Sequence, residues 1–211
     1  THVGEYAFAN CTSLAEVVGL EQVVSVDKYA FYGCKSMNSL TLTAMERVGD
    51  WAFAIENQTT GYTSVSMPAV QTIGAHAFLG NRASKLSLPA TLVSIGDGAF
   101  ASSKLLTEFT AAGDVFFVEN GALYRKITDE KFELVAYPSG RSGAAENYVL
   151  TVKDGTVKVQ SYAVAFLAED VLQKAVLPYS VRSIGDGAFY QSGILDYTFE
   201  SVVAPTLEFR Y

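Results

Sequence analysis

The stretch V-G-D-W-A-F at residues 48–53 decides the fold of this chain, because close copies of it recur along the sequence. Each copy begins with an aliphatic residue, usually has Gly second, and ends in Ala-Phe. The copies end at Phe8, Phe31, Phe53, Phe78, Phe100 and Phe189, and a degenerate seventh, V-Q-S-Y-A-V, ends at Val164. The first five lie 22 to 25 residues apart. A period of this length indicates a repeat architecture.

A second pattern follows most of these motifs and places two apolar residues on either side of one other residue. The copies are L-T-L at 40–42, V-S-M-P at 65–68, L-S-L-P at 86–89, A-V-L-P at 175–178 and Y-T-F at 197–199. Alternation over such a span predicts a short strand with one buried face. We therefore expect one strand and one return segment per repeat, with the Ala-Phe pair facing inward. Because so small a unit cannot bury its own apolar face, the units must stack into a solenoid with a parallel sheet of about seven rungs.

The Gly in the second position of the motif occurs in five of the seven copies. Gly is the residue that most readily adopts unusual backbone angles, so this position predicts a tight bend. Asp27 and Gln160 at the same position indicate that the requirement is not absolute.

The period breaks between about residues 112 and 147. Asn120-Gly121 is the preferred dipeptide of a type I′ hairpin turn, and strand-forming residues flank it. With a second turn at 128–131, this segment predicts a three-stranded β-meander followed by a polar linker. A single domain over 1–211 is expected, with repeats one to five at 1–111, the meander and linker at 112–147, repeats six and seven at 148–199, and a cap or truncated repeat at 200–211.

The composition excludes several classes of function. Fifteen Lys and Arg against twenty-two Asp and Glu give a net charge of −7, opposite to what neutralisation of nucleic-acid phosphates requires. The sequence contains no apolar run of eighteen residues, and T-H-V-G-E-Y-A-F has neither the basic nor the apolar region of a signal peptide. We expect no nucleic-acid partner, no transmembrane segment and a soluble chain.

The phrases I-G-D-G-A-F, V-G-D-W-A-F and L-S-L-P-x-x-L-x-x-I-G resemble the BspA-like, or treponemal-type, leucine-rich repeat, and the resemblance covers nearly the whole chain. It implies an α/β horseshoe-type leucine-rich repeat solenoid that is β-rich with few or short helices, interrupted by the meander. It also implies a bacterial cell-surface or secreted module that binds proteins or glycans, as adhesins do. The family has no fixed ligand-binding residues that could be carried over to this sequence.

Residue types that often support chemistry do not form a recognisable constellation here. Cys11 and Cys34 occupy equivalent positions on neighbouring repeats, which favours two buried free thiols and leaves a disulfide as the alternative. G-D-G-A-F-A at 96–101 formally fits a dinucleotide fingerprint, but it stands in the frame of the repeat rather than between a strand and a helix. His76 occupies a variable slot of the motif and reads as a solvent-facing or half-buried filler. We expect no catalytic, cofactor or metal site, and therefore no enzyme.

The outward face of the strands is the best candidate for binding, because the residue between the two inward positions must point away from the core. This column reads Val18, Thr41, Ser66, Ser87, Thr110, Val176 and Thr198. The hydroxyl residues Thr41, Ser66, Ser87, Thr110 and Thr198 are the predicted ligand-binding residues, with Tyr32 and Tyr190 as further contacts. Three hypotheses remain open: a module that binds a protein or glycan, a structural spacer that holds another domain off the cell envelope, and, least supported, an enzyme with a site at the meander.

Overall fold

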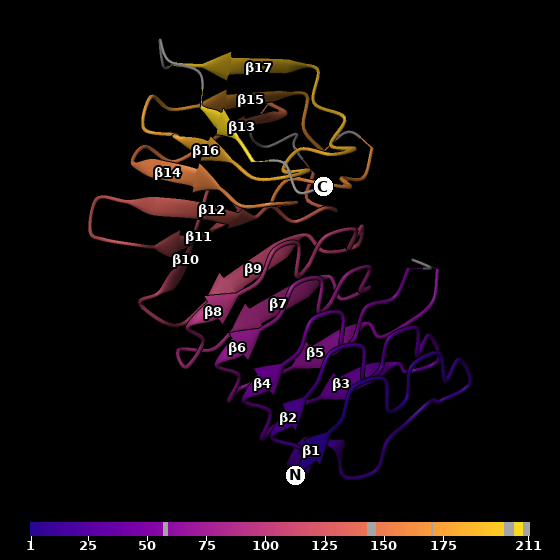
Figure 1. Ribbon diagram of the computed structural model, residues 1–211. Helices are drawn as coiled ribbons and strands as arrows, with labels where there is room; N and C mark the ends of the chain where they lie inside the picture. Colours follow the sequence, from indigo (N-terminus) through magenta and orange to yellow (C-terminus); the bar gives the residue numbers. More distant parts are fainter. Residues whose placement is uncertain (57–58, 143–146, 170, 201–204, 209–211) are drawn as a thin grey trace.

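The chain folds into an elongated stack of turns, as the repeats predict. The computed structural model describes residues 1–56, 59–142, 147–169, 171–200 and 205–208. Residue 1 lies at one end of the stack and strand β17 (Asp196–Phe199) at the other (Figure 1). Within the described residues the only helical element is the 3₁₀ turn η1 (Leu20–Gln22). The solenoid of parallel strands with little helix is confirmed.

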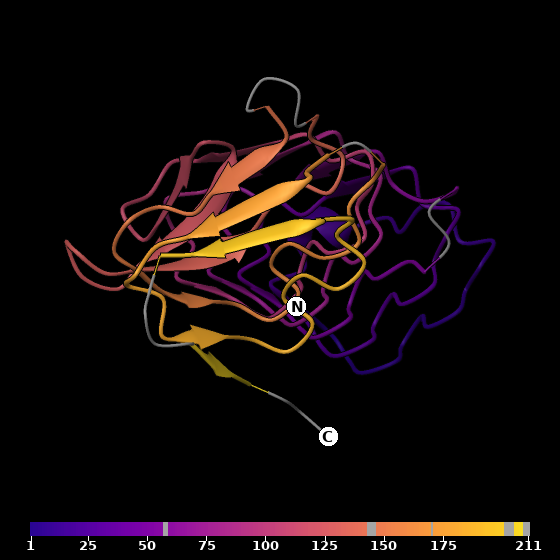
Figure 2. The same ribbon diagram turned by 90° about the horizontal axis from the view of Figure 1, so that it is seen from above.

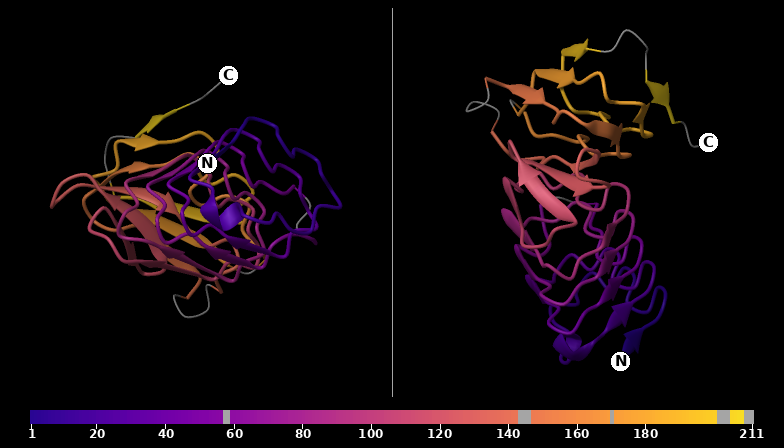
Figure 3. Two further views of the ribbon diagram at one scale, coloured as in Figure 1. Left: turned by 90° about the horizontal axis from the view of Figure 1, so that it is seen from below. Right: turned by 90° about the vertical axis from the view of Figure 1, so that its left-hand side faces the viewer.

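Most turns contribute two strands rather than the single strand that we expected. One row of strands carries the alternating apolar pattern, and we call it the first row. It consists of β3 (Ser39–Thr41), β5 (Ser64–Ser66), β7 (Lys85–Leu88), β9 (Glu108–Ala111), β13 (Val149–Thr151), β15 (Lys174–Leu177) and β17. The second row lies on the opposite side of the stack and immediately precedes the Gly position of the motif (Figures 2 and 3). It includes β1 (His2–Val3), β2 (Ser25–Val26), β4 (Arg47–Val48), β6 (Thr72–Ile73), β8 (Ser94–Ile95), β14 (Thr156–Val159), β16 (Ser183–Ile184) and β18 (Thr206–Leu207).

Strands that pair within either row do so in parallel, and in the first row these ladders join β3 to β5, β7 to β9, and β13 to β15 to β17. In the first row Leu40 stands opposite Val65, and in the second row Val48 stands opposite Ile73. The prediction of one strand per repeat was wrong because most strands of the second row have only two residues, too few to show alternation.

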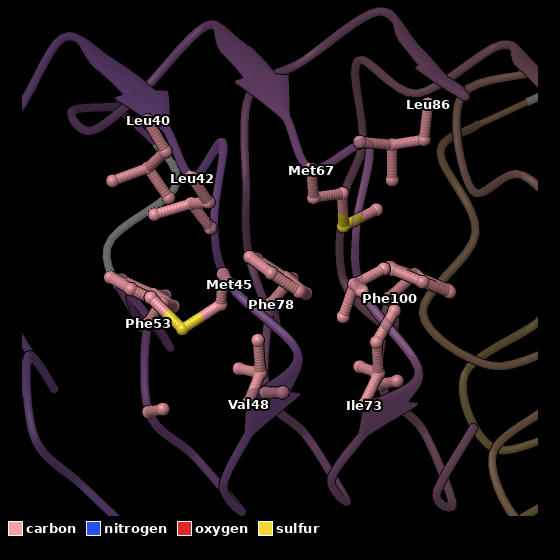
Figure 4. Packing of buried hydrophobic residues seen from close by; sticks show 14 of the residues in the cluster. Leu40, Leu42, Met45, Val48, Phe53, Met67, Ile73, Phe78, Leu86 and Phe100 are labelled. Carbon is pink, nitrogen blue, oxygen red and sulfur yellow. The ribbon is translucent and has the colours of Figure 1, made fainter. Parts of the chain in front are cut away.

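The Phe residues of the motif lie between the two rows and fill the interior, as predicted. Figure 4 shows Phe53, Phe78 and Phe100 between the first row above and the second row below. Their rings stack in sequence, with centroids 5.6 Å apart from Phe53 to Phe78 and 6.1 Å apart from Phe78 to Phe100. Val164, which replaces Phe in the seventh copy, is also fully buried.

The Gly of the motif does not make the bend that we predicted. The left-handed backbone falls two residues later, where Tyr29, Trp51 and His76 all have φ between 53° and 59°. The Gly is needed for close packing instead: a Cβ on Gly49 would lie 2.6 Å from the backbone carbon of Asp27 and from the nitrogen of Lys28 on the preceding turn. Gln160 at this position uses its longer side chain, whose Nε2 donates to the carbonyl of Ile95 at 3.1 Å.

The predicted meander is present and divides the interior in two. It consists of β10 (Phe116–Glu119), β11 (Ala122–Lys126) and β12 (Phe132–Ala136), all antiparallel, and Asn120 and Gly121 both have positive φ as a type I′ turn requires. Leu123 and Val135 pack into a first core, which contains the Phe residues of the early turns. Alternate residues of the same strands, including Tyr124 and Leu134, pack into a second core around Val164. The meander is therefore a partition with both faces buried.

The end of the meander forms the main chain of one more turn. The N–H of Tyr137 donates to the carbonyl of Ala163 at 2.7 Å, the bond that Phe53 makes to Ala77 in a regular turn. β12 also pairs in parallel with β14. The stack thus has a turn, marked by Tyr137, that the motif did not reveal.

Two predicted segments fall partly outside the described residues. Residues 143–146 of the expected linker, and residues 201–204 and 209–211 of the expected cap or truncated repeat, are not described. The described part of the latter includes β18, which pairs in parallel with β16 and so continues the second row.

Candidate functional site

Four predicted hydroxyl residues lie side by side on the outer surface of the first row. Thr41, Ser66, Ser87 and Thr110 are all exposed, and we call them the hydroxyl strip. Thr41 stands opposite Ser66 in the β3–β5 ladder, and Ser87 stands opposite Thr110 in the β7–β9 ladder. The Thr110 hydroxyl donates to the Ser87 hydroxyl at 3.0 Å. The strip places one hydroxyl on each of four successive strands.

A shallow groove of about 560 Å³ runs beside the strip. Ser66, Ser87 and Thr110 line it, together with Pro68 and Pro89, which follow β5 and β7. Pro ends each strand because it cannot continue the backbone ladder. Groups that can donate and accept hydrogen bonds therefore border an apolar surface, a combination that suits recognition of a polar polymer.

Two ion pairs join neighbouring strands of the first row. Lys85 Nζ lies 2.6 Å from Glu108 Oε2. On the other side of the meander, Lys174 Nζ lies 3.1 Å from Asp196 Oδ2. Each pair joins the first residues of two neighbouring strands, and both pairs are partly exposed, so each contributes about 0–1 kcal/mol to stability.

Thr198 does not join the strip, although it faces outward on the same row. It is half-buried on β17, beyond the meander, opposite Val176 of β15. Thr151 of β13 stands opposite Val176 on the other side and completes a separate short row. Sequence reasoning missed Thr151, although the sequence L-T-V at 150–152 carries the same alternating pattern as the other strands.

Val18, which we aligned with the strip, does not lie on a strand. Residues 15–18 have no regular structure, and the Val18 side chain is 95% exposed. The first turn therefore contributes no strand to the first row.

Aromatic side chains form a second surface row, along the left-handed positions of the turns. The ring of Tyr29 stacks on Tyr6 at 4.9 Å and on Trp51 at 5.9 Å, and His76 lies 4.3 Å from Trp51. Tyr162 then contacts His76 at 5.2 Å, and it occupies the space that Gly98 leaves free. Because the rings cover one another's faces, this row stabilises the turns rather than offering ring faces to a ligand.

His76 is half-buried, as predicted for a filler. Burial lowers the pKa of His76 below its usual value, while Asp97 and Asp50 act in the opposite direction. Of the two tyrosines predicted as contacts, Tyr190 is exposed, but Tyr32 is half-buried and donates its hydroxyl proton to Glu56 at 2.6 Å. That hydrogen bond, with burial, raises the pKa of Tyr32 to about 12.

The space beside the meander is too small for a substrate. It measures about 10 Å³, room for about one water molecule, and lies between Phe100 and Tyr137. Among the described residues, no group of three or more His, Cys, Asp or Glu side chains could hold a metal ion. No helix in the described part of the chain is long and apolar enough to span a membrane.

The two cysteines are free thiols, but only one is buried. Cys34 is buried and its Sγ donates to the carbonyl of Phe8 at 3.0 Å, whereas Cys11 is exposed. The expectation that both are buried was wrong for Cys11, which lies on the side of the first turn that faces away from the second and is not covered by any described residue. Burial raises the pKa of the Cys34 thiol to about 11.

The two thiols should therefore differ in reactivity. At pH 8 a thiol with a pKa of about 11 is only about one-thousandth thiolate, the reactive form. We expect Ellman's reagent to label one thiol of the native protein rapidly and the second only after urea is added, with the rapid phase absent in Cys11→Ser and present in Cys34→Ser. Equal rates for both thiols, or no reaction before a reductant is added, would contradict this assignment.

Comparison with known proteins agrees with this geometry. The family model for the BspA type leucine rich repeat region matches six copies over residues 1–128 and 150–206. A search of curated proteins finds no related sequence.

Solved structures share the fold at low sequence identity. A leucine-rich cell surface protein from Faecalibacterium prausnitzii has a TM-score of 0.70 at 17% identity, over 95% of this chain and 69% of that one. A leucine-rich repeat protein from Eubacterium ventriosum has a TM-score of 0.61 at 18% identity, over 86% and 61%. The pneumococcal vaccine antigen PcpA has a TM-score of 0.66 at 17% identity, over 94% and 56%. The chain thus spans between 56% and 69% of the length of these structures. The family match over most of the chain, together with the stacked two-strand turns, shows that this chain belongs to the BspA-type leucine-rich repeat family.

Proposed function

We propose that this chain is a non-catalytic binding module of a bacterial cell-surface or secreted protein and that it recognises an extended protein or glycan through the hydroxyl strip. The observation that carries the proposal is the exposure of Thr41, Ser66, Ser87 and Thr110 on the outer surface of the first row, the last three beside a groove of about 560 Å³. Thr41 is in register with Ser66, and Ser87 is in register with Thr110. Solenoids commonly bind partners along such extended faces. The similarity to a cell surface protein and to a vaccine antigen supports the extracellular location.

The hydroxyl strip suits a polar polymer for a physical reason. Ser and Thr hydroxyls both donate and accept hydrogen bonds, and they cost little to desolvate compared with charged groups. Paired strands lie about 4.8 Å apart, so each ladder presents two neighbouring hydroxyls at this spacing to a ligand lying across the strands.

A triple substitution tests the strip. Thr41→Glu, Ser66→Glu and Ser87→Glu together place three carboxylates on it, and we expect binding to immobilised matrix proteins or to a glycan array to fall at least about tenfold. The control replaces exposed residues elsewhere, Gln71→Glu, Ser94→Glu and Gln191→Glu, with the same change in net charge. Circular dichroism establishes that both variants are folded.

The outcome separates the two main functions. Loss of binding in the strip variant alone supports the binding module. Equal binding by both variants excludes the strip as the site. A wild-type protein that binds no member of either panel contradicts the proposal and favours the alternative, a spacer that holds another domain off the cell envelope.

A further inference from the structure

The first turn separates from the second one beside strand β3. Hydrogen bonds join the two turns on either side of this strand. The Ser36 hydroxyl donates to the backbone carbonyl of Thr12 at 2.6 Å, and the N–H of Ala44 donates to the backbone carbonyl of Glu21 at 3.1 Å. Between these contacts no hydrogen bond joins residues 15–18 to β3 in the part of the chain that the structure describes. A gap of about 600 Å³ occupies this space.

The gap exposes one edge of β3. Along a parallel strand the backbone N–H and C=O groups of successive residues point to opposite sides. The N–H of Leu42 points to β5, because it donates to the backbone carbonyl of Ser66. The backbone groups of Ser39 and Thr41 therefore point the other way, toward the gap. β3 pairs only with β5, so these groups have no strand partner among the described residues.

The gap has an apolar floor and an acidic rim. Leu20 and Met37, which are 5% and 2% exposed, lie at its base, and Val17 is half-buried beside them. Glu16 and Glu21 are exposed at the rim. No Lys or Arg lines the gap, and neither glutamate forms an ion pair with any described residue.

We propose that the gap binds an extended peptide segment of another protein, which adds to the free edge of β3 as a strand and places a Lys or Arg side chain between Glu16 and Glu21. Strand addition supplies partners for the backbone groups of Ser39 and Thr41. The apolar stem of a Lys or Arg side chain covers Leu20 and Met37 while its charged end reaches the two carboxylates. This site adjoins the hydroxyl strip, because Thr41 also lines the gap, and it goes beyond the proposed function.

Charge complementarity selects a basic segment rather than an acidic or neutral one. The chain has a net charge of −7, and the gap adds two carboxylates with no compensating cation nearby. A glycan would satisfy the rim but not the backbone groups of β3, which are spaced for another polypeptide strand.

Hydrogen exchange tests the free edge directly. In the unbound protein we expect the amides of Ser39 and Thr41 to exchange at least about tenfold faster than those of Leu40 and Leu42, which face β5. Equally slow exchange at all four amides would overturn the assignment of a free edge.

Peptide selection tests the occupant. Random heptapeptides are selected on the immobilised protein, and we expect the enriched peptides to carry a Lys or Arg flanked by β-forming residues. The best of them should protect the amides of Ser39 and Thr41. The same peptide with N-methyl groups at alternate residues should lose binding, because it cannot complete the ladder.

Charge variants provide the matched comparison. The double variant Glu16→Gln, Glu21→Gln should lower the affinity for the selected basic peptide by roughly tenfold. The double variant Ser66→Glu, Ser87→Glu, whose residues do not line the gap, should leave that affinity unchanged. Enrichment of acidic peptides, unchanged affinity in the Gln variant, or no enrichment at all would each overturn the proposal. Protection of Ser39 and Thr41 without peptide, together with dimers in sedimentation, would show a second copy as the occupant and overturn it as well. Thr41 belongs to both sites, but Glu16 and Glu21 lie outside the strip, and Ser66 and Ser87 do not line the gap. Comparison of these two double variants therefore lets either proposal fail alone.

Discussion

Gly49→Ala is expected to destabilise the protein by about 3 kcal/mol, because the new Cβ meets backbone that cannot move aside. It would lie 2.6 Å from the carbon of Asp27 and the nitrogen of Lys28, and 3.0 Å from the oxygen of Asp27. Relief of this contact requires the third turn to move away from the second one. This movement stretches hydrogen bonds between the two turns, such as the one from the N–H of Tyr29 to the backbone carbonyl of Asp50. Urea titration monitored by the fluorescence of Trp51, the single tryptophan, measures the effect two residues away.

Gly4→Ala is the matched control, since Gly4 has the same position in the motif on the first turn. No atom lies within 4 Å of the Cβ that would be added there. We expect a change of less than about 0.5 kcal/mol. Similar losses for both variants would mean that the Gly is required for its backbone conformation and not for the approach of neighbouring turns.

Phe78→Ala is expected to cost about 3–5 kcal/mol, the range for truncation of a fully buried aromatic side chain. Phe78 has no exposed surface, stacks between Phe53 and Phe100, and meets the edge of Tyr62 at 6.4 Å. The cavity has no easy means of collapse, because the second-row ladders of β6 to β4 and to β8 fix the turns on either side. Chemical denaturation followed by circular dichroism gives the loss of free energy.

Phe8→Ala tests whether position in the stack sets this cost. Phe8 is only half-buried and stacks on one neighbour, Phe31, at 5.0 Å. We expect it to lose less than half as much stability as Phe78→Ala. An equal loss would argue that each Phe acts within its own turn rather than through the stack.

The stack itself could be predicted from the sequence, whereas the details of its turns could not. The Phe position and an alternating apolar pattern recur in most repeats, so the period and the inward side chains could be predicted. The strands of the second row could not be predicted, because a strand of two residues such as Arg47–Val48 shows no alternating pattern. The role of the Gly was misread because its constraint comes from the neighbouring turn, which a single repeat does not reveal.

The candidate sites divide in the same way. Alternation alone placed Thr41, Ser66, Ser87 and Thr110 on one outer face, and their exposure follows from it. Thr198 lies apart because the number of turns inserted at the meander could not be deduced from the motif. The gap beside β3 depends on where the first turn leaves the second, and Val18 aligned with the strand pattern although its segment is not a strand.

The meander separates the interior into two cores, and this bears on how the number of turns in such a solenoid can change. β11 and β12 present one set of side chains to each core, so the buried residues on either side form two separate clusters. Whole turns could be gained or lost within one half while the interior of the other half stays as it is. Length and binding surface can thus change independently at the two ends of the rod.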